Sequence, residues 1–201
     1  MLHDLWHERK RIMKLLVKQM TLIALFSVGV NSAHGNEIDK NTQQQAKQKI
    51  QTFAKQLKGQ LLQAVKSGGF EAGIEVCEKQ APIIAKQLST DGWQVSRTSL
   101  KARNSNNQPL PWQRKVLEQF EHEQDQGKPV NQLLFVKQDA HSFKMMKAIP
   151  TGELCLACHG KNIAEPIQQK VQQLYPNDMA TGFAVGDIRG AFVVEKETSK
   201  S

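Results

Sequence analysis

Residues 132–159 read QLLFVKQDAHSFKMMKAIPTGELCLACH, and this stretch carries both a strand pattern and a chemical motif. The runs 132–137 and 143–149 are rich in residues that favour strands, and Gln138-Asp139-Ala140 separates them. This pattern predicts two antiparallel strands joined by a hairpin turn that contains His141. The stretch then ends in Cys155-Leu156-Ala157-Cys158-His159.

Cys-x-x-Cys-His is the attachment motif of a c-type haem. The thiols of Cys155 and Cys158 add to the two haem vinyl groups, and the short spacer lets one turn of chain reach both. The adjacent imidazole of His159 becomes an axial iron ligand. Redox Cys-x-x-Cys pairs open a helix in a βαβ context, and a zinc site needs further Cys or His at close spacing; neither context surrounds this motif. The sequence therefore predicts one covalent haem c.

The first 35 residues have the composition of an export signal. Basic residues between Arg9 and Lys18 precede the apolar run Met20–Val30, and Ala33-His34-Gly35 ends in the small residues that a signal peptidase reads. The apolar run is shorter than the roughly 20 residues of a membrane-spanning helix. Because bacteria attach c-type haem outside the cytoplasm, we expect residues 1–35 to be a cleaved signal peptide and residues 36–201 to be a periplasmic haem-binding domain. Only an uncleaved signal peptide would hold the chain at a membrane.

Residues 36–201 keep 22 of the 27 basic and 17 of the 19 acidic side chains, which leaves a net charge of +5. These charges are scattered along the chain and few aromatic residues lie among them, so we expect no nucleic-acid partner. The basic balance favours docking to a redox partner protein with an acidic surface. The length of this part of the chain suits one domain with one core.

The periodicity of apolar residues predicts an α+β domain, rather than the all-helical build that is common in small c-type cytochromes. The expected helices cover residues 38–66, residues 70–88, a segment from Trp112 to near Gly127, and residues 165–174. Gly68-Gly69 should end the first helix, and Pro82 should break or kink the second. The expected strands cover residues 93–100, 132–137, 143–149 and 188–195.

A third cysteine, Cys77, is left over once the motif has used the other two. It is a buried inert thiol, a reactive thiol or an iron ligand, and its apolar neighbours suit the first reading. Other side chains that could supply a second axial ligand are Met145, Met146, Met179, His122 and His141. The candidates for hydrogen bonds to the haem propionates are Arg97, Lys101, Arg103 and Arg189.

Residues 76–85, 97–104, 154–160 and 175–192 resemble, in the same order, the Tll-like c-type haem domain family. The resemblance implies a single PAS-like domain, with an antiparallel sheet and flanking helices around a Cys-x-x-Cys-His haem turn. Domains of that family occur alone and as the extracytoplasmic part of bacterial sensor proteins. The resemblance also implies that His159 is the proximal iron ligand and Cys77 the distal one. Ser105 stands where relatives usually have Pro, which leaves only the local turn in doubt.

These features lead us to expect a periplasmic monohaem c-type cytochrome with a redox or electron-transfer role. The alternative is a haem-based redox or gas sensor, which binds a small gaseous ligand when the thiolate leaves the iron. The chain stops at Ser201 with no membrane span or kinase segment after the haem domain, so we expect any signal to pass to a separate protein. No acid-base pair suited to a peroxidase is visible in the sequence, so we expect no enzyme activity.

Overall fold

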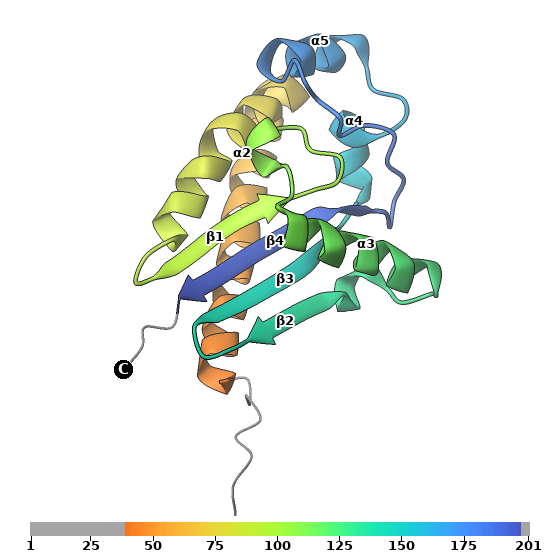
Figure 1. Ribbon diagram of the computed structural model, residues 1–201. Coiled ribbons are helices and arrows are strands. Elements are labelled where there is room, and N and C mark those ends of the chain that lie inside the picture. Colours follow the sequence, from red (N-terminus) through yellow and green to blue (C-terminus); the bar gives the residue numbers. More distant parts are fainter. Residues whose placement is uncertain (1–38, 198–201) are drawn as a thin grey trace, which may run out of the picture. The chain divides into compact units, whose positions relative to one another are not determined.

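The computed structural model describes residues 39–197, and this part of the chain begins with a long helical hairpin, α2 (Lys40–Leu88) (Figure 1). Gly68 and Gly69 leave helical geometry, and Gly69 has a φ of 73°, which favours glycine. These two residues divide α2 into two segments close to the predicted bounds. The expectation of a signal peptide over residues 1–35 lies outside the described residues.

The two segments of α2 pack closely against each other. A Cβ at Gly73 would lie 3.0 Å from side-chain atoms of Leu61 and Val65, so this glycine permits the close approach. Further along, Nζ of Lys49 donates to the carbonyl oxygen of Leu88, at 2.9 Å, and so satisfies the end of the second segment.

Of the break or kink expected at Pro82, the break does not occur, because the helical dihedral angles continue through this residue. Pro82 is exposed, whereas its neighbours Ala81 and Ile84 are buried in one cluster with Phe53 and Leu57 of the first segment. This packing holds the helix together across the hydrogen bond that proline cannot donate.

Four strands form one sheet in the order β1-β4-β3-β2, and all neighbours are antiparallel. The strands are β1 (Trp93–Thr98), β2 (Leu134–Gln138), β3 (Ser142–Pro150) and β4 (Ile188–Glu197). The predicted hairpin of β2 and β3 is confirmed, but β2 begins later than expected because residues 130–132 form a 3-10 turn, η2 (Val130–Gln132). Strand β1 ends before the predicted residue 100.

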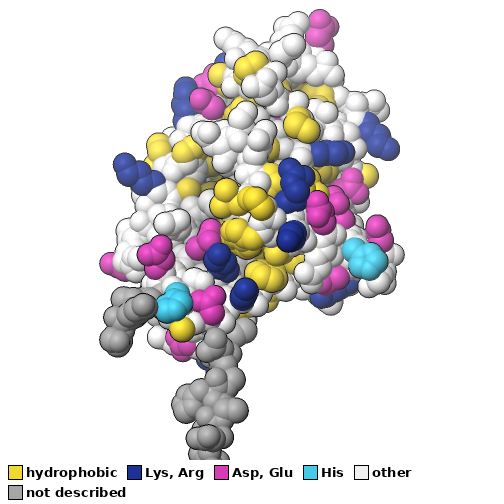
Figure 2. Space-filling model, viewed as in Figure 1, with side chains coloured by type: hydrophobic (Ala, Val, Ile, Leu, Met, Phe, Trp, Pro, Cys, Tyr) yellow, Lys and Arg dark blue, Asp and Glu magenta, His cyan; other side chains and the backbone are white. Residues whose placement is uncertain are grey.

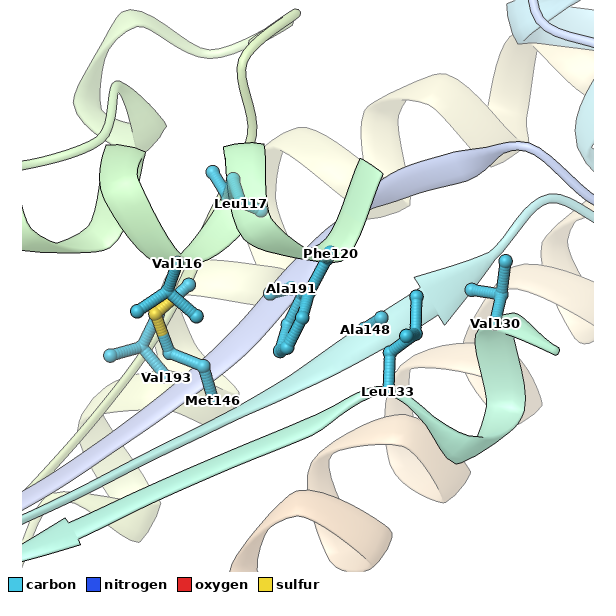
Figure 3. Close-up of a cluster of buried hydrophobic side chains, with 9 residues drawn as sticks. All are labelled: Val116, Leu117, Phe120, Val130, Leu133, Met146, Ala148, Ala191 and Val193. Atoms are coloured by element: carbon cyan, nitrogen blue, oxygen red, sulfur yellow. The ribbon is translucent and has the colours of Figure 1, made fainter. Parts of the chain in front are cut away.

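Helices cover both faces of the sheet (Figure 1). Side chains alternate between the faces along β3, so Met145 packs on the face of α2 and Met146 on the face of α3 (Pro111–Asp125). Figure 3 shows Met146 beneath α3, together with Val116 and Val193. The described residues thus form an α+β fold with a core on each side of a four-stranded sheet.

The remaining elements lie near one end of the sheet (Figure 1). They are η1 (Ser105–Asn107), η3 (Glu153–Cys155), α4 (Leu156–His159) and α5 (Glu165–Leu174). The turn in doubt at Ser105 does form, because the Asn104 side chain accepts a hydrogen bond from the N–H of Asn106. No helix within residues 39–197 is both long and apolar enough to span a membrane.

Candidate functional site

The Cys155–His159 motif forms one tight helical turn where β3 ends. Strand β3 leads into η3, and η3 continues into α4, whose last residue is His159. Residues three apart share a face of a helix, so Cys155 and Cys158 lie on the same side of this turn. Both are half-buried free thiols. At Gly160 a Cβ would lie 2.6 Å from the carbonyl oxygen of Leu156, so glycine permits the tight ending of the turn.

His159 is held in the form that binds metal ions. Its Nδ1 lies 2.7 Å from the carbonyl oxygen of Ala180, which can only accept, so we assign the proton to Nδ1 and a free lone pair to Nε2. Burial, together with the charges of Arg189 and Arg103, lowers the pKa of His159 to about 2. The imidazole is therefore neutral around pH 7 and available through Nε2.

A buried ion pair fixes the carbonyl group that orients His159. Nε and Nη2 of Arg103 donate to the two carboxylate oxygens of Asp178, each at 3.1 Å, and the two side chains are 8% and 9% exposed. Nη2 also donates to the carbonyl oxygens of Cys158, at 2.5 Å, and Ala180, at 3.3 Å. Arg103 thus ties the motif to the segment that follows α5.

That segment, residues 178–187, wraps around the motif. The N–H of Phe183 donates to the carbonyl oxygen of His159, at 3.0 Å, and the N–H of Gly186 donates to that of Thr151, at 2.8 Å. The Phe183 ring meets the His159 imidazole edge to face, with 6.3 Å between the ring centroids. In the sequence these residues lie in one of the segments that resemble the family, but neither the resemblance nor the turn signals assigned a role to Asp178, Ala180 or Phe183.

Cys77 lies on the second segment of α2 and faces the same site. The structure records it as half-buried, and α2 contacts both α4 and α5. Burial raises the pKa of the Cys77 thiol, while the charges of Arg97, Arg103 and Arg189 lower it. The thiols of Cys77 and Cys158 also act electrostatically on each other, so the structure brings the third cysteine close to the motif.

Tyr175 closes the site on the side of α5. It packs with Ile74 of α2 in a cluster that Cys158 also touches. Burial, together with the nearby Cys77, raises the pKa of Tyr175 to about 12. The phenol is therefore neutral around pH 7. In the sequence, Tyr175 is only the first residue of one of the segments that resemble the family.

The four propionate candidates differ in their surroundings. Arg103 is engaged with Asp178, as described above. Lys101 is exposed, with Nζ 5.3 Å from the centroid of the Phe183 ring. Burial lowers the pKa of Arg97 and of Arg189, and neither makes an ion pair with a carboxylate among residues 39–197.

Most of the alternative axial ligands lie away from the motif. Met145 and Met146 are 0% exposed and belong to the two sheet cores. His122 is exposed on α3, where its Nε2 lies 3.0 Å from Nε2 of Gln126. His141 is exposed in the turn between β2 and β3, as predicted, at the opposite end of β3 from the motif. Met179 is 57% exposed and is the one alternative that adjoins the site, next to Ala180.

Comparison with known proteins identifies the family. The family profile described as Tll0287-like matches residues 32–196, which include every helix and strand described above apart from the last residue of β4. Among solved structures, the chain is similar to the cyanobacterial heme-protein Tll0287, with 27% identity and a TM-score of 0.58, over 81% of this chain and 99% of that chain. A search of curated proteins found no match. Since the family profile covers the whole described fold and its site, the chain belongs to the Tll0287-like family.

Proposed function

We propose that this chain is a periplasmic monohaem c-type protein that transfers electrons. Cys155 and Cys158 would bind the haem through thioethers, and His159 would ligate its iron through Nε2. One observation carries the proposal: the hydrogen bond from Nδ1 to Ala180 leaves Nε2 of a neutral His159 free, next to two thiols on one helical turn. The similar solved structure is that of a heme-protein, which supports the same cofactor here.

The set of donors at the site fits a haem better than a bare metal ion. Within residues 39–197, no group of three or more His, Cys, Asp or Glu side chains could hold a metal ion. A structural zinc site takes four protein ligands, whereas a haem iron needs only axial ligands from the protein. When bound, the haem would supply a one-electron redox couple.

The direct test is to express the full chain in a periplasm with the c-type maturation machinery, beside a Cys155→Ala/Cys158→Ala variant. We expect the wild-type chain to keep its haem through denaturing electrophoresis, and the double variant to lose it. A matched control is Cys77→Ser, which removes a cysteine from the same site but leaves the thioether bonds possible. Equal haem staining of the wild type and the double variant would show that the motif does not attach the haem.

Cys77 is the proposed distal ligand, as a thiolate. Its place beside the motif and the positive charges of Arg97, Arg103 and Arg189 support this assignment, since they favour an anion there. The ferric wild-type protein should then be low-spin, and Cys77→Ser should convert its absorption spectrum to that of a high-spin haem. Met179→Ala removes the one alternative ligand that adjoins the site and should leave the spectrum unchanged. The opposite pattern would assign the ligand to Met179.

The second candidate function is a haem-based sensor. The placement of Cys77 on α2, the helix that packs on one face of the sheet, favours it. Loss of Cys77 from the iron on reduction would open the iron to carbon monoxide or nitric oxide. It would also remove the bond between α2 and the haem. The PAS-like fold expected from the family resemblance suits such a role, and the sheet with helices on both faces is compatible with it. Rapid carbon monoxide binding to the reduced protein would favour the sensor, and its absence would favour the carrier.

The proposed partner of an electron carrier is a redox protein with an acidic docking surface. Figure 2 shows Lys and Arg side chains interleaved with Asp and Glu on the visible face, with no single dominant basic patch. This distribution suits a transient protein contact more than a nucleic-acid backbone, which selects for clustered basic residues.

A further inference from the structure

Two guanidinium groups beside the site have no acidic partner. Arg97 belongs to β1, and Arg189 lies near the beginning of β4. In the part of the chain that the structure describes, no carboxylate lies within ion-pair distance of either side chain. Both side chains are half-buried, so an anion that compensates their charges would stabilise them.

Each of the two guanidinium groups lies against an aromatic ring. The Cζ atom of Arg97 is 5.4 Å from the centroid of the Phe53 ring, and that of Arg189 is 5.2 Å from the centroid of the Phe183 ring. Nη1 of Arg189 makes one long hydrogen bond, at 3.4 Å, to the carbonyl oxygen of Lys101. The side chain of Arg97 donates no hydrogen bond within residues 39–197, so most of the donors on both groups are available.

The positive charges gather around the proposed haem. The charges of Arg103, Arg97 and Arg189 all act on His159, and the first two also act on Arg189. Asp178 is the carboxylate that acts on Arg189, and it is already bonded to Arg103. Three guanidinium groups and one carboxylate leave two positive charges without compensation.

We infer that Arg97 and Arg189 form the binding site for the two propionate carboxylates of the haem, one guanidinium group for each. This inference rests on the proposed function. A haem carries two such carboxylates, which match the two uncompensated charges, and a guanidinium fork matches a carboxylate in two parallel hydrogen bonds. Arg103 is not assigned to a propionate, because Asp178 already compensates its charge and Nε and Nη2 are bonded to Asp178 and two carbonyl groups.

Arg97 has one other possible partner, the thiolate of Cys77, because each of these groups acts on the pKa of the other. A thiolate would account for one positive charge and would leave Arg189 without a partner. The two partners of Arg97 are separable by experiment, because the iron ligand and the propionates have different vibrational bands.

The experiment is resonance Raman spectroscopy of the ferric holoprotein, with Arg97→Gln, Arg189→Gln and a control, Arg114→Gln, on the exposed face of α3. We expect the propionate bending band to move to lower frequency in both site variants, because each loses hydrogen bonds to one carboxylate. The control should match the wild type, and the spin-state marker bands should stay the same in all three variants.

Several results would overturn the inference. An unchanged propionate band in either site variant would show that this arginine does not bind a propionate. A change of the spin-state bands alone in Arg97→Gln would assign Arg97 to the Cys77 thiolate.

Arg97→Lys and Arg189→Lys serve if the glutamine variants do not fold, because lysine keeps the charge but loses the fork and should move the same band. The wild-type spectrum is an independent test of the inference. A band at the frequency of a freely solvated propionate would show that the arginines do not bind the propionates. A wild-type chain without haem would overturn the proposed function as well, and this result is distinct from haem with unanchored propionates.

Discussion

At the scale of single residues, the site depends on a buried pair that carries no motif. Arg103 and Asp178 lie 75 positions apart, yet their contact holds both the Cys158 carbonyl and the Ala180 carbonyl. The Ala180 carbonyl group sets the orientation of His159, because it accepts the hydrogen bond from Nδ1–H. The orientation of His159, the proposed iron ligand, therefore depends on a group two contacts away from it.

Asp178→Asn should be strongly destabilising, because it leaves Arg103 buried without a counter-charge. Loss of one partner of a buried ion pair typically costs about 3–5 kcal/mol. Urea denaturation of the holoprotein measures the change. The control is Lys79→Gln, which breaks an exposed ion pair with Glu75 on α2 and should have little effect. Equal stability of Asp178→Asn and the wild type would mean that the pair does not hold the site together.

The residues of the site were not equally visible in the sequence. Cys155, Cys158 and His159 form a contiguous motif whose spacing by itself predicts haem attachment, and the structure shows them together on one helical turn. Cys77 had three open readings, and only the family resemblance selected one of them. Ala180 acts through its main-chain carbonyl group, which leaves no side-chain signature, and Asp178 acts through a contact that only the folded chain brings about.

At the scale of elements, glycine and proline positions predicted the helix boundaries well where the local backbone decides. Gly68 and Gly69 divide α2 as expected. Pro82 was predicted to break or kink the helix, and it does not break it, because buried contacts on either side of it outweigh a local preference. Strand ends were off by a few residues where 3-10 turns continue the backbone before β2 and irregular turns follow β1.

Two glycine substitutions should have opposite effects on stability. A Cβ at Gly59, on the exposed side of α2, meets nothing within 4 Å, so Gly59→Ala should stabilise the protein by about 0.5–1 kcal/mol. Gly190 in β4 has a φ of 147°, and a Cβ there would collide with the carbonyl oxygen of Thr98. Gly190→Ala should cost at least about 1–3 kcal/mol in backbone strain alone. Thermal denaturation of both variants checks the signs, and a stable Gly190→Ala protein would contradict this reading of β4.

The pairing of β3 with β4 predicts a pH effect. Lys144 and Glu195 are cross-strand partners, and burial raises the pKa of Glu195 while Lys144 lowers it less. The folded state therefore binds a proton on Glu195 more tightly than the unfolded state does. This proton contributes its full stability below the unfolded pKa, and the contribution is lost as the pH rises through the folded pKa. Glu195→Gln should therefore gain stability relative to the wild type between about pH 4 and about pH 7. Urea denaturation at both pH values measures this difference, and a constant difference would refute the effect.

At the scale of the whole molecule, the α+β class could be predicted from the sequence, but the assembly could not. Strand β1 pairs with β4, the last strand of the sheet, and no local pattern specifies a partner so far along the chain. The site needs this topology, because Arg97 comes from β1, Arg189 from β4, Cys77 from α2 and the motif from the end of β3. Four distant segments thus meet where the sequence showed only one motif.

The most direct test of the account is the intact mass of the chain, purified from a periplasm with the c-type maturation machinery and measured under denaturing conditions. The account predicts the mass of residues 36–201 plus one haem, because the signal peptide is removed and two thioether bonds survive denaturation. A chain whose mass contains no haem would contradict the central claim, whichever residue its N-terminus begins with.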